Sequence, residues 1–263
     1  MENKTKFIKV AERIMFKQVT EGLDYDLESG ETYEPQYDRY SGEITLKVVN
    51  KLELPDKVYS TVNDDKFINK VLAQYKNVNF GVLGVMLAGL KGSGKSVMAK
   101  NIAIQSNLPI IVMDKTFPAH KLKTLFAKLA DVDACILFDE IDKIGEDYDD
   151  DLLLQVLDGM NTAGRKLVVF TCNDTEEVNE YLIDRCSRIR YWKEFDEMSA
   201  SMINQVLTDN LDDKSKIDEL TDFVQQNLEC ISFDNILSFV KEVNCYPDET
   251  FDDLLDDMNL SRK

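Results

Sequence analysis

The fold is decided by residues 89–96, Gly89-Leu90-Lys91-Gly92-Ser93-Gly94-Lys95-Ser96, which fit the pattern G-x-x-x-x-G-K-[ST]. An apolar strand is predicted before them, at Val85–Ala88, and a helix after them, at Ser96–Gln105. Glycines let backbone N–H groups turn toward an anion, and the start of the following helix adds positive charge. We therefore expect this loop to bind phosphate groups, with Lys95 on the β- and γ-phosphates and Ser96 on Mg²⁺. The residues expected to contact the nucleotide are Lys91, Gly92, Ser93, Gly94, Lys95 and Ser96.

Two further predicted strands lead into polar side chains. Asp139 and Glu140 directly follow the run Ala134–Phe138, and Asn173 follows the run Leu167–Thr171. Open α/β folds bind ligands at the carboxyl edge of the sheet, where these residues would meet. Asp139 is predicted to support Mg²⁺ through water, and Glu140 to act as a general base on the attacking water. Asn173 is predicted to orient that water.

The pattern between Phe80 and Phe195 alternates apolar runs with helical stretches. Continuous apolar strands joined by helices indicate a parallel sheet covered on both faces, here of five strands. The remaining elements predicted in this block are strands at Pro109–Met113 and Arg188–Trp192 and helices at His120–Leu129 and Asp151–Met160. The fold class is therefore α/β.

The two ends of the chain differ from this block. Near the N-terminus, strands are predicted at Phe7–Val10 and Glu43–Val49 around a long hairpin or loop, followed by a helix near Asp64–Tyr75. After Phe195 only helical periods remain, near residues 198–210, 214–228, 233–243 and 249–258. The predicted domains are a β-rich extension (1–53), an α/β domain (54–195) and a helical lid (196–263).

With these motifs in this order, the chain from about Leu54 onward resembles an AAA+ ATPase module of the P-loop NTPase superfamily. Gly89–Ser96 corresponds to the Walker A motif, Cys135–Glu140 to Walker B and Asn173 to sensor 1. The resemblance implies a sheet of order 5-1-4-3-2, a helical lid and hydrolysis of ATP with Mg²⁺. More loosely, the chain is similar to AAA ATPases encoded by bacteriophages.

The resemblance also implies a subunit interface. Arg185 and Arg188 match two arginines that in this family reach the neighbouring subunit's ATP, and an arginine fork suits the charge that develops on the γ-phosphate. Cys-Ser stands between them in place of Pro-Gly, so which of the two reaches across stays open. A ring of identical subunits, expected to be a hexamer, would remodel a protein or a protein–nucleic-acid target.

Three other positions are interpreted through the same resemblance. Phe117 is either a substrate-gripping pore residue or a packing residue at the start of a helix. Val58 and Tyr59 are expected near the adenine. The third lid helix lacks the sensor 2 arginine, so no lid residue is assigned to the γ-phosphate.

Composition limits the partners and the chemistry. The 31 basic and 49 acidic residues give a formal charge of -18, which argues against bulk binding to nucleic acid or anionic membrane. The five cysteines form no C-x-x-C pair, and the single histidine, His120, excludes mechanisms that need two. Apolar runs are too short for a membrane span, and no signal-peptide pattern occurs. We expect a cytoplasmic protein, or one in the host cytoplasm if phage-encoded.

Three alternatives remain open. A GTPase or nucleotide kinase shares the phosphate-binding loop, but the guanine motif Asn-Lys-x-Asp is absent. A replication-type loader or helicase loader acting on DNA would need a basic surface, for which Lys121, Lys123 and Lys128 form the nearby cluster. A non-hydrolysing ATP-binding scaffold is disfavoured because Lys95, Asp139 and Glu140 are all present.

Overall fold

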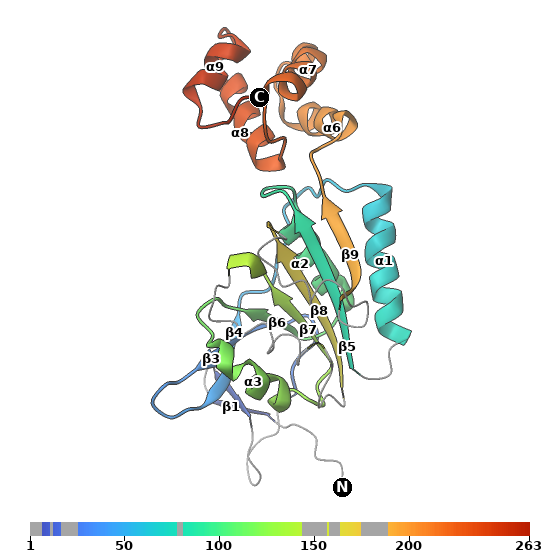
Figure 1. Ribbon diagram of the computed structural model, residues 1–263, viewed down its shortest axis with the longest axis vertical. Helices are drawn as coiled ribbons and strands as arrows, with labels where there is room; N and C mark the ends of the chain where they lie inside the picture. Colours follow the sequence, from blue (N-terminus) through green and yellow to red (C-terminus); the bar gives the residue numbers. More distant parts are fainter. Residues whose placement is uncertain are drawn as a thin grey trace. The chain divides into compact units, whose positions relative to one another are not determined.

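A computed structural model of the 263-residue chain describes residues 7–10, 13–16, 26–77, 81–143, 157, 164–174 and 189–263 (Figure 1). Within these residues, nine strands form one sheet in the order β1-β2-β4-β3-β6-β7-β8-β5-β9. The strands are β1 (Phe7–Val10), β2 (Arg13–Phe16), β3 (Thr32–Tyr37), β4 (Ile44–Val49), β5 (Gly81–Gly89), β6 (Ile110–Met113), β7 (Ala134–Phe138), β8 (Arg165–Cys172) and β9 (Ile189–Phe195).

The helices of the described residues follow the predicted periods. They are α1 (Val62–Asn77), α2 (Lys95–Ser106), α3 (Leu122–Lys128), α6 (Ala200–Asn210), α7 (Ile217–Asn227), α8 (Phe233–Cys245) and α9 (Phe251–Asp257), with 3₁₀ turns η1 (Ala119–Lys121), η2 (Ile141–Lys143) and η3 (Lys214–Lys216). Of the helix predicted at Asp151–Met160, only Leu157 lies within the described residues.

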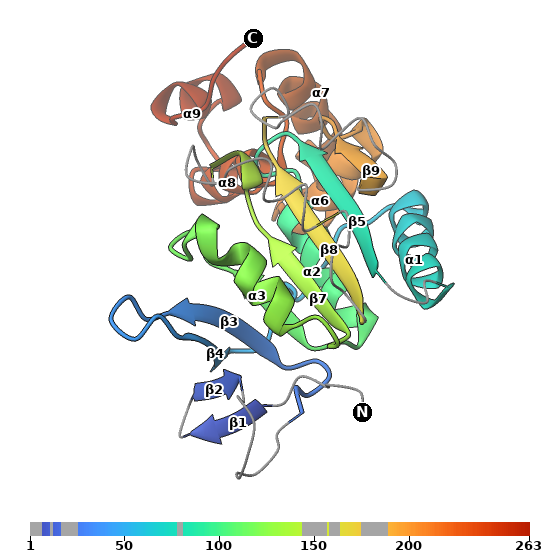
Figure 2. The ribbon, with the colours of Figure 1, turned by 60° about the horizontal axis from the view of Figure 1, so that its bottom comes forward.

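The five predicted central strands are confirmed as β5, β6, β7, β8 and β9. Their order β6-β7-β8-β5-β9 is the predicted 5-1-4-3-2 order once the strands are numbered from β5. The pairs β6–β7, β7–β8 and β8–β5 are parallel. All five residues of β7 and the six from Leu83 to Ala88 in β5 are buried. Such continuous burial is typical of a sheet covered on both faces, and Figure 2 shows α3 in front of the sheet and α2 behind it.

The N-terminal strands extend this same sheet. β1, β2, β4 and β3 pair antiparallel, and β3 joins the central strands by pairing parallel with β6 through Thr32 and Tyr33. The Tyr33 and Leu46 side chains are fully buried in the core that also receives Leu125 of α3. The hairpin alternative expected in this region is confirmed by β3 and β4, which pair antiparallel, whereas β2 was not predicted.

Contacts divide the chain into two units, each described separately. Residues 1–88 and 96–193 form the sheet unit, and residues 89–95 and 194–263 form the lid unit. The domain boundaries predicted at 53/54 and 195/196 stay predictions. Among the described residues, no helix is both long enough and apolar enough to cross a membrane.

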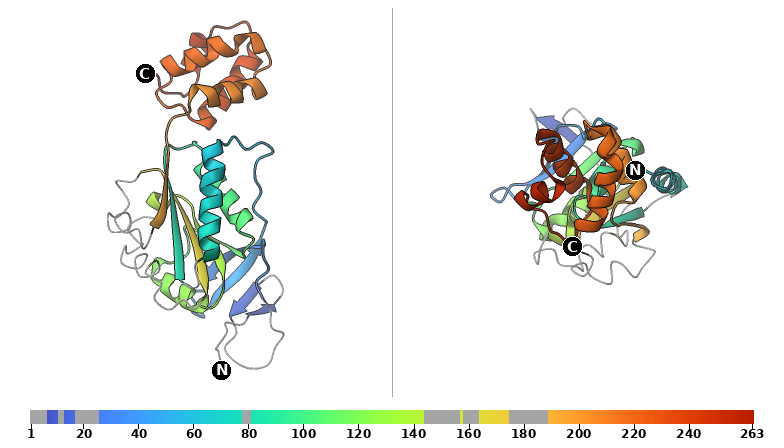
Figure 3. Two further views of the ribbon diagram at one scale, coloured as in Figure 1. Left: turned by 90° about the vertical axis from the view of Figure 1, so that its right-hand side faces the viewer. Right: turned by 90° about the horizontal axis from the view of Figure 1, so that it is seen from above.

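The lid unit contains the four helices α6 to α9 (Figure 3). Leu207, Val224 and Phe239, one from each of the first three helices, are fully buried. Ser199 and Ser232 cap α6 and α8 by accepting hydrogen bonds from backbone N–H groups of the first turn, which replaces partners that a helix start lacks. The predicted helical lid is confirmed in its elements.

Candidate active site

The phosphate-binding loop has the backbone that its glycines allow. Gly89 has a φ of 127°, and a Cβ there would lie 2.2 Å from the carbonyl oxygen of Phe195. Any other residue would therefore clash with the end of β9, within the lid unit. Gly92 and Gly94 also have positive φ angles, of 74° and 98°, which favour glycine.

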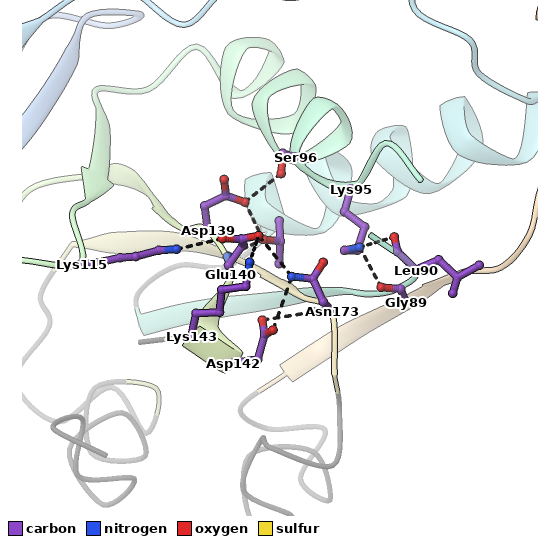
Figure 4. Close-up of polar contacts among 11 residues, drawn as sticks. Gly89, Leu90, Lys95, Ser96, Lys115, Asp139, Glu140, Asp142, Lys143 and Asn173 are labelled. Carbon is purple, nitrogen blue, oxygen red and sulfur yellow. Dashed lines mark hydrogen bonds and ion pairs between the residues drawn. The ribbon is translucent and has the colours of Figure 1, made fainter. Parts of the chain in front are cut away.

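Lys95 and Ser93 turn inward in this loop. The Lys95 side chain is almost fully buried, and its Nζ donates to the carbonyl oxygens of Gly89 (2.8 Å) and Leu90 (2.5 Å) (Figure 4). The Ser93 hydroxyl is buried and has no hydrogen-bond partner among the described residues. A buried hydroxyl without a partner costs free energy, so an added acceptor would stabilise it. Its position in a glycine-rich loop fits a phosphate oxygen.

The lid contacts the same loop. The N–H of Phe233, the first residue of α8, donates to the carbonyl oxygen of Gly92 at 3.1 Å. The side chains of Ser232 and Asp234 pack close to Gly92. The start of α8 therefore fixes the middle of the loop, within one unit.

Asp139 follows β7 in the sheet unit and accepts hydrogen bonds from two hydroxyl groups. Its Oδ1 accepts hydrogen bonds from Ser96 Oγ at 2.9 Å and from Thr171 Oγ1 at 2.6 Å (Figure 4). Ser96 and Asp139 are the residues predicted for Mg²⁺, so the structure brings the predicted pair together. No three ligand-type side chains cluster into a cation site in the described part of the chain. Mg²⁺ often takes only one or two protein ligands together with phosphates and water, so this pair fits it.

Glu140 has an unusual backbone conformation and a side chain held by charged partners. Its φ is 54°, in the left-handed region. Lys115 Nζ lies 2.8 Å from Oε2, and Lys143 Nζ lies 2.6 Å from Oε1. The hydrogen bond from Lys115, then that from Lys143, lowers the pKa of the Glu140 carboxyl to about 2. Glu140 is therefore ionised at neutral pH, and its proton affinity stays low while both lysines are in place.

Asn173, one residue after β8, lies beside this carboxylate. Its Nδ2 donates to Glu140 Oε1 at 3.3 Å and to Asp142 Oδ2 at 3.4 Å, and its backbone N–H donates to Asp142 Oδ1 at 3.1 Å (Figure 4). Asp142 therefore fixes both the backbone and the amide of Asn173. The predicted general base and the predicted water-orienting residue are thus neighbours.

Comparison with known proteins agrees with this arrangement. Residues 85–194 match the model of the ATPase family associated with various cellular activities (AAA). This segment is therefore similar to the AAA family. It includes the phosphate-binding loop, Asp139, Glu140 and Asn173.

A similar curated protein is the probable inactive ATP-dependent zinc metalloprotease FTSHI 4, chloroplastic, of Arabidopsis thaliana, which is 33% identical over 118 residues. The similar region takes up 41% of this chain and 12% of that protein. The likeness is thus confined to a small part of the longer protein.

Four residues of the AAA segment that contact the predicted site were missed from the sequence: Lys115, Asp142, Lys143 and Thr171. Lys115 follows β6 by two positions, and Asp142 and Lys143 follow Glu140 in η2. Their positions after parallel strands are the available signal, because the carboxyl ends of such strands gather at one edge. The partners of Lys115, Asp142 and Thr171 depend on strand register, which no local pattern specifies, whereas Lys143 contacts Glu140 three positions before it.

The other predicted positions of the AAA segment have different outcomes. Phe117 is 3% exposed and lies in the main core, so the packing interpretation is correct and the substrate-gripping one is wrong. The turn Asp114–Phe117, closed by the Phe117 N–H on the Asp114 carbonyl, directs the ring inward. His120 is exposed, with its ring edge against Tyr37. Arg185 and Arg188 lie outside the described residues.

The remaining expectation concerns the adenine. Val58 and Tyr59 are half-buried in the segment between β4 and α1, and Lys57 Nζ lies 5.4 Å from the Tyr59 ring centroid. Their role beside the base stays a prediction.

Proposed function

We propose that this protein binds ATP with Mg²⁺ and hydrolyses it. The observation that carries the proposal is the contact chain Ser96–Asp139–Thr171–Glu140–Asn173, which joins a predicted metal pair to a predicted base and its amide neighbour. The AAA family match over residues 85–194 supports nucleotide binding by this segment.

Phosphate binding is assigned to the loop. The Ser93 hydroxyl, which lacks a partner among the described residues, would donate to a phosphate oxygen. Lys95 would exchange the carbonyls of Gly89 and Leu90 for the β- and γ-phosphates, since an ammonium binds a phosphate more strongly than a neutral carbonyl. Mg²⁺, when held by Ser96 and through water by Asp139, would neutralise charge on the phosphates.

Hydrolysis is assigned to Glu140 and Asn173. Glu140 would accept a proton from water while the water oxygen bonds to the γ-phosphorus and the bond to the leaving oxygen of ADP breaks, giving ADP and inorganic phosphate. The Asn173 amide would orient that water. Lys115 and Lys143 each contact one Glu140 oxygen, and departure of either lysine would raise the pKa of this carboxyl and make it a stronger base.

The assembly belongs to the proposal as well. Arg185 and Arg188 are proposed to complete the site of the neighbouring subunit in a ring, which would act on a protein or protein–nucleic-acid target. Activity per subunit should then rise with protein concentration. Stimulation by single-stranded DNA would favour the loader function over protein remodelling.

A second candidate is a non-hydrolysing ATP-binding scaffold. The observation in its favour is the pair of lysines on Glu140, which holds the pKa of this carboxyl at about 2 and makes it a weak base. The similar chloroplast protein is likewise described as probable inactive.

The test compares nucleotide binding with phosphate release in four proteins. Wild type should bind a fluorescent ATP analogue and release phosphate, and Glu140→Gln should bind equally while releasing phosphate on the order of 10²–10⁴ times more slowly. Lys95→Ala should bind more weakly. Glu219→Gln, which removes the same charge from an exposed position in α7, serves as the matched control. Binding without release in wild type would support the scaffold, and loss of neither activity in Glu140→Gln would refute the assigned base.

A further inference from the structure

Thr171 connects the two adjacent carboxylate residues. It lies at the end of β8, is 2% exposed, and belongs to none of the motifs in the sequence. Its Oγ1 donates to Asp139 Oδ1 at 2.6 Å and accepts from the backbone N–H of Glu140 at 2.7 Å. A hydroxyl has one hydrogen and two lone pairs, so both bonds form at once.

Strand register brings Thr171 to this place. β7 and β8 are parallel, and Phe138 pairs with Phe170, so the next residues along, Asp139 and Thr171, continue side by side. On the opposite side Thr171 pairs with Leu87 of β5. Because β8 is held on both sides, the hydroxyl is a fixed reference point for the end of β7.

The two bonds act on different parts of the site. The bond to Asp139 orients its carboxylate, whose same oxygen receives Ser96. The bond from the Glu140 N–H holds a peptide whose φ of 54° is costly for a residue with a Cβ. This conformation breaks the strand alternation of side chains and lets Glu140 contact Asn173.

We propose that Thr171 is the positioning residue that sets both the metal-binding orientation of Asp139 and the catalytic orientation of Glu140. This inference rests on the proposed function. It assigns no contact with the nucleotide to Thr171. Its role is exerted through Asp139 and Glu140.

The experiment removes only the hydroxyl and then restores it. Thr171→Val keeps the shape of the side chain, and Thr171→Ser keeps the hydroxyl. We expect Thr171→Val to lower kcat for ATP about 10–100-fold with KM changed less than about 3-fold, and Thr171→Ser to recover most of the rate. Should Thr171→Val fail to fold, Thr171→Ala is measured against the same expectations.

A binding measurement separates this role from general stability. Mn²⁺ affinity in the presence of ADP, followed by the EPR signal of free Mn²⁺, should weaken about 10-fold in Thr171→Val and recover in Thr171→Ser. Thr221→Val is the matched control, because Thr221 is another buried threonine, in the lid unit, whose hydroxyl lies within hydrogen-bonding distance of two acceptors, Asn204 Oδ1 and the Ile217 carbonyl. It should leave both kcat and Mn²⁺ affinity unchanged.

The outcomes distinguish the two proposals. Unchanged kcat and Mn²⁺ affinity in a folded Thr171→Val protein, with an active wild type, overturns the positioning role and leaves the ATPase proposal intact. Equal losses in Thr171→Val and Thr171→Ser also overturn it, because the hydroxyl would not be the cause. A wild type that binds neither ATP nor Mn²⁺ with ADP overturns the proposed function and this inference together.

Discussion

The left-handed conformation of Glu140 makes a prediction about stability that reverses the usual order of alanine and glycine. Among the described residues, Glu140 and Asn107 are the two non-glycine residues with positive φ, 54° and 52°. Placing a Cβ in this region costs roughly 1–2 kcal/mol, whereas glycine loses roughly 0.4–1 kcal/mol through the greater entropy of its unfolded chain. The midpoints differ by about 0.8 kcal/mol in favour of glycine. Glu140→Gly should therefore be more stable than Glu140→Ala by about that amount.

The comparison cancels the side-chain contacts. Both variants lose the ion pairs with Lys115 and Lys143 and the bond from Asn173 equally, so the difference reports the backbone alone. Urea unfolding followed by fluorescence suits the measurement, because the single tryptophan, Trp192, lies in β9 against the core of the sheet unit. A difference of this size corresponds to a shift in midpoint temperature of roughly 2–3 °C.

Two controls bracket the result. Asn107→Gly and Asn107→Ala should show the same order, since Asn107 shares the positive φ. Ala127→Gly, at an exposed position in α3, should show the ordinary order and lose roughly 1 kcal/mol. A Glu140→Ala protein as stable as Glu140→Gly, with the controls behaving as stated, would refute the strained conformation and the part of Thr171 in holding it.

Three further predictions concern the core and the loop. Lys166 is buried and donates to the Ala130 and Val132 carbonyls, and burial lowers the pKa of its ammonium group to about 8 from the ordinary 10.5. Between these two pH values the unfolded chain holds the proton more tightly than the folded chain does. Urea titrations should therefore show that the stability of wild type, relative to Lys166→Met, rises from pH 8 to 10.5. Phe117→Ala should cost roughly 3–5 kcal/mol of unfolding free energy, as truncation of a buried aromatic does, and a change in ATPase without that loss would contradict its packing role. Gly89→Ala should cost at least roughly 1–3 kcal/mol through the clash with the Phe195 carbonyl, measured by thermal unfolding.

The central strands could be predicted because their sequences are continuously apolar, which indicates burial without knowledge of the neighbouring strands. Ala134–Phe138 is apolar at every position and buried at every position, so its sequence specifies a strand covered on both faces. The strand β3 could not be predicted in the same way. Its sequence TYEPQY contains Pro35, which lacks a donor, and Pro35 is tolerated because pairing with β6 is confined to Thr32 and Tyr33. Whether a proline is tolerated here thus depends on how far β6 pairs along β3, which the sequence of β3 does not specify.

The residues of the candidate site likewise fall into those that the sequence could predict and those that it could not. Lys95, Ser96, Asp139, Glu140 and Asn173 were predicted because each follows a strand or opens a helix within a motif. Their partners could not be predicted, because the contact of a threonine with an aspartate 32 positions away depends on the register of two strands. Motifs thus predict which residues do chemistry, whereas register determines how they are oriented.

Two independent lines of reasoning point to Glu140 as a functional residue. One is its place after an aspartate at the end of β7, downstream of a phosphate-binding loop. The other is physical and needs no motif, since Glu140 combines a left-handed backbone with a pKa lowered to about 2. Local strain and perturbed ionisation cluster at functional sites because packing has to oppose them continuously. Two lysines contact this one carboxylate, and Asp139 and Asp142 lie near Lys143, so the positive charges at this point are matched by carboxylates. Loss of either lysine contact would raise the pKa of Glu140, so the strength of this carboxylate as a base depends on where those two lysines lie.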